Sequence, residues 1–209
     1  MLTAWFLDLS APAFVLLAAL LAMAADALLG DPDWLYRRVP HPVAALGHLI
    51  ALGDDRFNRE SLNDELRFER GVALTAAVVL LVVAAGFVLS VVTASVPGGW
   101  IVEGVLASTL IAFRGLYDHV AAVARGLARS LPEGRAAVAH IVGRDPDSLD
   151  RAGVARAAIE STAENFSDGV VAPVFWYLLL GLPGLLAYKA INTLDSMLGH
   201  HAPRYEAFG

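Results

Sequence analysis

The chain has 209 residues, of which 57% are hydrophobic and 17% are charged, and its net charge is −6. This composition is more apolar than that of an ordinary soluble domain, so we expect the lipid bilayer as the solvent of much of the chain. The negative charge and the lack of a Lys/Arg-rich patch argue against nucleic acid as a partner. Because the sequence contains no cysteine, disulfides, thiolate zinc sites and iron–sulfur clusters are excluded.

Four apolar runs predict membrane elements, at about residues 9–29, 71–96, 100–118 and 169–191. A hydrocarbon core about 30 Å thick needs roughly 20 apolar residues, which these runs reach or approach. The first run has no positive residues before it, so it is interpreted as a span and not as a cleaved signal peptide. We therefore predict an all-α polytopic membrane protein, with residues 1–209 forming a single helical domain.

The arginines predict the orientation. Six arginines fall between Asp31 and Arg70 and seven between Arg114 and Arg156, whereas none precedes the first run. The positive-inside rule then places two blocks, about residues 30–70 and 119–168, in the cytoplasm and the N-terminus outside. We expect amphipathic helices in these blocks, one continuing to Pro132 and another running from about Asp145 to Asn165. The expected location is the inner (cytoplasmic) membrane, with the active site on the cytoplasmic side.

The fourth run is interrupted by Leu182-Pro183-Gly184. Its two parts, of 13 and 8 residues, are each too short to span the bilayer. A re-entrant hairpin would bring Asn192 and Asp195 back to the side of Asp168, whereas a single tilted span would separate them. The sequence leaves both arrangements open.

Acidic and amide side chains gather immediately before this fourth run. Glu160 and Glu164 are four residues apart, and Asn165 and Asp168 follow. Arg156 and Glu160 fit equally well as a solvated ion pair on one helix face. Glu164, Asn165 and Asp168 indicate function instead, because a carboxylate at the mouth of a membrane element is costly unless it binds something.

Other polar residues are weaker candidates. Asp26 lies within an apolar run, where a carboxylate typically faces a partner or a water-filled cavity. Lys189, the only lysine, either anchors the helix at the membrane interface or belongs to the site. Arg144 could lie beside a helix N-terminus that accepts a phosphate. His41 and the His200-His201 pair lack the spacing of a zinc site, so no zinc is expected.

Several stretches, in this order and spacing, resemble the adenosylcobinamide-phosphate synthase family of cobalamin biosynthesis (CbiB/CobD). They are Asp26-Ala-Leu-Leu-Gly-Asp-Pro32, Pro40-His-Pro-Val43, Val142-Gly-Arg-Asp145, Glu160-Ser-Thr-Ala-Glu-Asn-Phe-Ser-Asp-Gly-Val-Val-Ala-Pro173, Tyr188-Lys-Ala-Ile-Asn-Thr-Leu-Asp-Ser-Met197, and Arg204-Tyr205 with Phe208-Gly209. None is specific alone, but together they cover the chain from end to end.

The resemblance implies a carbon–nitrogen ligase. Such an enzyme uses ATP and Mg²⁺ to join a carboxylate of adenosylcobyric acid to aminopropanol or its O-phosphate, giving adenosylcobinamide or its phosphate. With no P-loop in the sequence, acidic residues would hold the Mg²⁺. The expected catalytic and Mg²⁺-binding residues are Glu164, Asp168 and Asp195. The expected substrate-binding residues are Asn165, Asn192, Arg144, Lys189, His41 and Asp26, with Arg144 and Lys189 holding phosphate.

The resemblance also implies a further C-terminal part. Members of that family continue beyond the stretch that ends in Phe208-Gly209, with another polar motif and more membrane helices. We therefore expect either a truncated chain or a second polypeptide that supplies the rest. A non-catalytic membrane subunit that binds a corrinoid or scaffolds the pathway is the alternative function. A small transporter is a third, which the lack of paired repeat halves disfavours.

Overall fold

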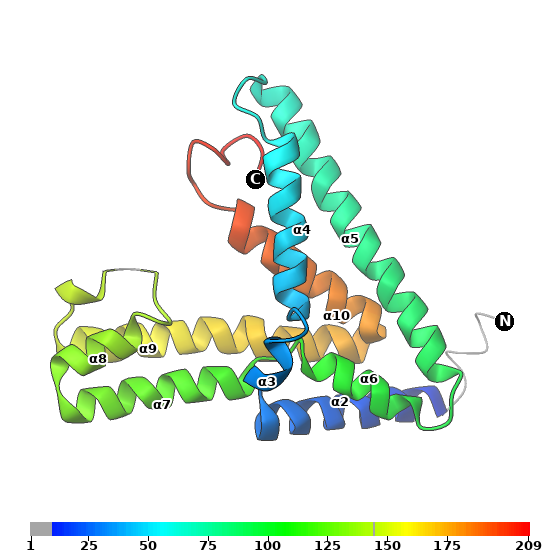
Figure 1. Ribbon diagram of the computed structural model, residues 1–209, viewed down its shortest axis with the longest axis horizontal. Coiled ribbons are helices and arrows are strands. Elements are labelled where there is room, and N and C mark those ends of the chain that lie inside the picture. Colours follow the sequence, from blue (N-terminus) through cyan, green and yellow to red (C-terminus); the bar gives the residue numbers. More distant parts are fainter. Residues whose placement is uncertain (1–9, 144) are drawn as a thin grey trace.

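The computed structural model describes residues 10–143 and 145–209, and the regular secondary structure within them is entirely helical. The helices are α2 (Ser10–Leu29), α3 (Asp33–Tyr36), α4 (Pro42–Phe57), α5 (Asp64–Ala94), α6 (Gly99–Ser108), α7 (Phe113–Arg129), α8 (Leu131–Val138), the 3₁₀ turn η1 (Pro146–Ser148), α9 (Arg151–Phe166), the π-helical turn η2 (Ser167–Val171) and α10 (Ala172–Leu198). In Figure 1, α7, α8 and α9 form an elongated arm, while α4 and α5 extend away from it.

Four segments of the described chain are long and apolar enough to cross a membrane, which confirms the predicted all-α polytopic class. They are Pro12–Leu29, Asp64–Ala94, Gly99–Arg129 and Arg151–Leu198. The second segment is the single helix α5, whose 31 residues exceed the length that a 30 Å core requires. It begins at Asp64 because the Asn63 side chain accepts the N–H of Leu66 at 3.0 Å and caps the helix.

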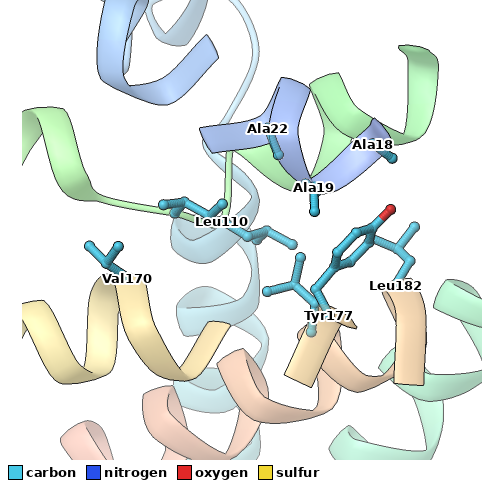
Figure 2. Close-up of a cluster of buried hydrophobic side chains, with 10 residues drawn as sticks. Ala18, Ala19, Ala22, Leu110, Val170, Tyr177 and Leu182 are labelled. Carbon is cyan, nitrogen blue, oxygen red and sulfur yellow. The ribbon is translucent and has the colours of Figure 1, made fainter. Parts of the chain in front are cut away.

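Small side chains on α2 allow α6 and α10 to pack closely against it. Figure 2 shows the buried cluster that results, in which the labelled residues are Ala18, Ala19, Ala22, Leu110, Val170, Tyr177 and Leu182. A Cβ added to Gly104 of α6 would lie 2.9 Å from the carbonyl oxygen of Ala18. Such close approach through small residues is the usual way in which membrane helices associate.

A buried carboxylate links three helices in this region. Glu103 of α6 is 2% exposed and accepts hydrogen bonds from the Thr93 hydroxyl of α5 at 2.6 Å and the Tyr177 hydroxyl of α10 at 2.9 Å. Hydroxyl donors satisfy both carboxylate oxygens, which offsets part of the cost of burying the group. This cluster therefore fixes the first part of α10 against α5 and α6.

The direction of α10 changes at Gly181, where φ is 67° and ψ is −158°. Only glycine adopts this backbone conformation readily, and Pro183 immediately afterwards removes a backbone donor. The break therefore lies one residue before the predicted Leu182-Pro183-Gly184 interruption. Helix α5 passes close to the turn, because a Cβ on Gly86 would lie 2.8 Å from the Cα of Pro183.

The arm differs from the prediction at two helix boundaries. Helix α7 ends at Arg129, and Pro132 lies in the first turn of α8, whose cap Ser130 accepts the N–H of Glu133 at 3.3 Å. Asp145 caps only the short turn η1, and α9 begins later, with Asp150 accepting the N–H of Gly153 at 2.6 Å. Two successive aspartate caps thus divide what the sequence indicated as one helix.

The last residues fold back onto α4 and α5 through a polar network. Asp54 accepts hydrogen bonds from Asn58 Nδ2 at 2.8 Å, Arg204 Nη2 at 2.9 Å and the Tyr205 hydroxyl at 3.3 Å. Arg67 donates to Asn58 Oδ1 at 3.1 Å and to the backbone carbonyl of Arg204. This network holds the C-terminal segment in a defined position.

Candidate functional site

A cavity of about 470 Å³, a volume typical of small-molecule sites, lies where the arm meets α10. Its walls come from α7, the segment after α8, the junction of α9 with η2, and the second part of α10. The lining residues are Ala112, Gly115, Leu116, His119, His140, Ile141, Val142, Asn165, Asp168, Gly169, Lys189 and Asn192. Residues from both sides of the Gly181 break therefore share one cavity.

The π-helical turn η2 contributes Asp168 and Gly169 to the cavity. Such turns insert an extra residue into a helix and are frequent at functional sites. The carbonyl of Gly169 accepts the N–H of Ala112 at 2.9 Å, which joins the start of α7 to this turn. One turn earlier, Asn165 Nδ2 donates to the Ser161 carbonyl at 2.8 Å and to its hydroxyl at 3.0 Å, so the amide is held in one orientation.

Lys189 is the charged residue buried in the cavity wall, with 9% of its surface exposed. Asp168 and Asp31 are near enough to attract its ammonium electrostatically. No carboxylate of the described chain lies within the 4.0 Å of an ion pair with it. The phenol of Tyr188 is also a neighbour of Asp168. A buried cation without a close counter-ion is costly, which points to an anionic ligand in the cavity.

Asp31 has two aromatic neighbours, His41 and Tyr36. His41 Nε2 lies 3.3 Å from Asp31 Oδ1, while its Nδ1 accepts the N–H of Val43 at 3.2 Å. The Nδ1 acceptor leaves the ring proton on Nε2, which donates to Asp31. Burial and the neighbouring Asp31 raise the pKa of the Tyr36 phenol above its ordinary value of 10.0. His41 thus orients Asp31 and caps α4, and Asp31 is a residue to which sequence reasoning gave no role.

Asp26 has a different environment from the cavity residues. It is 3% exposed, and its Oδ2 accepts the backbone N–H groups of Phe113 at 2.8 Å and Arg114 at 3.3 Å. These are the first free N–H groups of α7, whose own preceding residue, Ala112, has no capping side chain. The buried carboxylate on α2 therefore caps a helix distant in sequence.

Among the described residues, the other predicted site residues do not line this cavity. Glu164 and Asp195 are exposed, and Arg144 lies outside the described residues. Among the residues that the structure describes, no three His, Cys, Asp or Glu side chains are grouped closely enough to hold a metal ion. The predicted trio of Glu164, Asp168 and Asp195 is therefore not assembled into a protein-only site.

Two histidines that the sequence did not single out, His119 and His140, also line the cavity. The rings of His119, on α7, and His140, after α8, have centroids 6.3 Å apart and planes inclined by 31°. Within the described residues, neither imidazole forms a hydrogen bond or ion pair. No local pattern could have indicated them, because only the packing of α7 against α8 brings the two positions together.

Comparison with known proteins gives a family match over most of the chain. A family model described as "CobD/Cbib protein" matches residues 19–209. A protein of Sinorhizobium sp named cobalamin biosynthesis protein CobD is 53% identical over 199 residues, which are 93% of this chain and 61% of that protein. Proteins of the same name from Sinorhizobium fredii and Rhodobacter capsulatus are 49% and 50% identical, over 93% and 90% of this chain and 60% and 59% of their own length.

The chain therefore spans about 60% of the length of the curated relatives that it matches. No solved structure gives a significant match.

Proposed function

The chain belongs to the CobD/Cbib protein family, and from this membership we propose that it acts in cobalamin biosynthesis as an ATP-dependent carbon–nitrogen ligase. The proposed product is the amide between adenosylcobyric acid and aminopropanol or its O-phosphate. The observation that carries the proposal is the cavity that Asp168 and Lys189 both line, from opposite sides of the Gly181 break. The proposed partners are these substrates and the lipid bilayer.

Amide formation requires two things of a site. The attacking amine has to lose a proton, and the carboxylate has to be converted to a form with a good leaving group. In our proposal, Asp168 either accepts the proton from the amine or holds Mg²⁺-ATP, because a carboxylate bound to the metal is a weaker base. Lys189 offsets the negative charge of the anionic substrate groups, and His119 and His140 supply further N–H donors at the same cavity.

The donor set of the cavity fits Mg²⁺-ATP. Mg²⁺ is usually held by one or two carboxylates together with substrate phosphates and water, so a complete protein cage is unnecessary. Asp168 would provide the carboxylate ligand, and Asn165 and Asn192 would provide amide oxygens. When bound, Mg²⁺-ATP would supply the phosphoryl group that activates the carboxylate.

The size of the cavity limits what it can enclose. A volume of about 470 Å³ suits a small molecule or part of a larger one. A corrinoid with its adenosyl ligand is far larger, so we propose that only its reacting side chain enters. The macrocycle would then lie against the outside of the arm.

The test is amide formation by purified protein in lipid nanodiscs, with adenosylcobyric acid, aminopropanol phosphate and Mg²⁺-ATP, followed by mass spectrometry. Two forms are compared: the 209-residue chain, and the same chain extended by the part of the Sinorhizobium sp relative that follows the matched region. Product from either form supports the ligase. If neither gives product while both bind adenosylcobyric acid, the non-catalytic corrinoid-binding subunit is the better assignment.

A further inference from the structure

A second and larger cavity, of about 670 Å³, lies between the end of α4 and the first turns of α5. In Figure 1 this end of α4 and α5 points away from the arm that bears the first cavity. The lining residues are Arg56, Phe57, Arg59, Arg70, Ala73, Leu74 and Ala77. The proposed amide chemistry assigns no role to any of them.

The lining carries three positive charges and no negative one. Within the described residues, the guanidinium groups of Arg56, Arg59 and Arg70 form no ion pair or hydrogen bond. Two nearby carboxylates are engaged elsewhere: Asp54 pairs with Arg204 at 2.9 Å, and Asp64 pairs with Arg67 at 3.6 Å. No carboxylate of the described chain lines the cavity itself. Three arginines that converge on one cavity without a counter-ion favour an anion with several oxygens, because guanidinium donors match phosphate geometry.

The lining of the cavity also passes from charged to apolar residues along α5. Arg70 is the last ionisable residue before 32 positions, residues 71–102, that have no ionisable side chain. That run begins the apolar part of α5, so Arg70 lies at the level of the lipid headgroups. Ala73, Leu74 and Ala77 follow by one and two turns and form an apolar wall within the hydrocarbon.

We propose that this cavity binds an anionic phospholipid, with its phosphate against the three arginines and the start of an acyl chain against Ala73, Leu74 and Ala77. A soluble phosphate would use only the charged half of the cavity. A phospholipid uses both halves, and basic pockets between membrane helices are known sites for anionic headgroups. The bound lipid bridges α4 and α5 at the end where Asp54 and Arg67 hold the C-terminal segment.

The test uses the full chain in nanodiscs of phosphatidylcholine with a minor fraction of phosphatidylglycerol, and native mass spectrometry to count retained lipids. The triple variant Arg56→Gln, Arg59→Gln, Arg70→Gln is compared with a charge-matched control on the arm, Arg125→Gln, Arg129→Gln, Arg156→Gln. Each cavity arginine should contribute about fivefold to phosphatidylglycerol retention, so the triple variant should lose about a hundredfold. The control should retain phosphatidylglycerol as the wild type does.

A second variant separates lipid binding from general attraction to a charged surface. Ala77→Trp fills the apolar wall but keeps all three arginines, and it should also reduce retention, by about tenfold if the acyl contact contributes. Equal loss in the arm control, equal retention of phosphatidylcholine, or complete displacement by soluble glycerol 3-phosphate would each overturn the proposal. Because lipid retention is measured without amide formation, failure of the ligase assignment leaves this test unaffected.

Discussion

Lys189 is a largely buried lysine for which the described chain provides no ion-pair partner. The residue as a whole is 9% exposed in the cavity wall, and its ammonium lies beyond ion-pair range of both neighbouring carboxylates. A group that served only to anchor the helix would extend toward water at the membrane interface. The energetic cost of keeping the charge buried is consistent with selection for ligand binding.

The substitution Lys189→Met should therefore separate activity from stability. Removal of a charged contact to an anionic substrate is expected to lower kcat/KM for amide formation by about tenfold to a hundredfold. The Tm in detergent should stay the same or rise, because a largely buried side chain without an ion-pair partner is replaced by an apolar one. Lys189→Arg should recover part of the activity. Unchanged kcat/KM in Lys189→Met would remove the ammonium from the site.

For Asp26 we expect the substitution to lower stability, in contrast to Lys189. Asp26→Ala leaves two buried N–H groups of α7 without an acceptor, so the free energy of unfolding should fall by about 2 kcal/mol. The matched control is Asp118→Ala, which removes only an exposed pair with Arg114 and should cost less than about 0.5 kcal/mol. Thermal unfolding in detergent measures both. Equal Tm values for the two variants would contradict the capping role.

At the scale of elements, the turn at Gly181 decides which residues share the cavity. Gly181→Ala forces a side chain into a backbone conformation with φ of 67°, at a cost of about 1–2 kcal/mol. A distorted turn should also move Lys189 relative to Asp168 and reduce amide formation by about tenfold or more. The control is Gly47→Ala within α4, where the nearest atom to the new Cβ, Sδ of Met197, is at 3.6 Å. If both variants retain wild-type Tm and activity, the turn does not control the site.

The cluster at Glu103 offers an independent test of how α10 is held. Tyr177→Phe removes one of the two donors to a buried carboxylate and should lower the free energy of unfolding by about 1 kcal/mol. The comparison is Tyr117→Phe. The Tyr117 side chain on α7 is exposed, so this substitution should change the free energy of unfolding by only a few tenths of a kcal/mol. An equal effect of the two substitutions would show that the Tyr177 hydroxyl is not a stabilising donor.

The sequence predicted the elements better than their junctions. Uncharged runs and prolines identify α5 and the interruption near Gly181 because membrane length and backbone sterics act locally. The start of α9 was predicted too early, since Asp145 and Asp150 both have capping chemistry and only the folded chain shows which one begins the long helix. The π-helical form of η2 has no comparable local signal.

The site was predictable only in part, for the same reason. Asn165, Asp168, Lys189 and Asn192 stand beside an apolar run, where polar side chains are conspicuous in the sequence. His119 and His140 become neighbours through the packing of α7, α8 and α9, and Asp31 is oriented through His41. Such long-range relations are not encoded in spacing along the chain.

For the molecule as a whole, the two cavities divide the proposed roles between two ends of the structure. The cavity at the arm has mixed charge and amide groups, which suits chemistry on a small polar ligand. The cavity at the end of α4 and α5 has only positive charge above an apolar wall, which suits a lipid. An anionic lipid would then bind at one end of the protein while the substrates bind at the other.

The most direct test of the central claim is amide formation by Asp168→Asn, measured by mass spectrometry on the form of the chain that gives product with the wild-type sequence. The control is Asp118→Asn, an exposed aspartate of α7 that does not line the cavity. If Asp168 accepts the proton of the amine, product should form at least about a hundredfold more slowly in Asp168→Asn, with the Tm unchanged, and at the wild-type rate in the control. A wild-type rate in Asp168→Asn would contradict the assignment of this cavity as the amide-forming site.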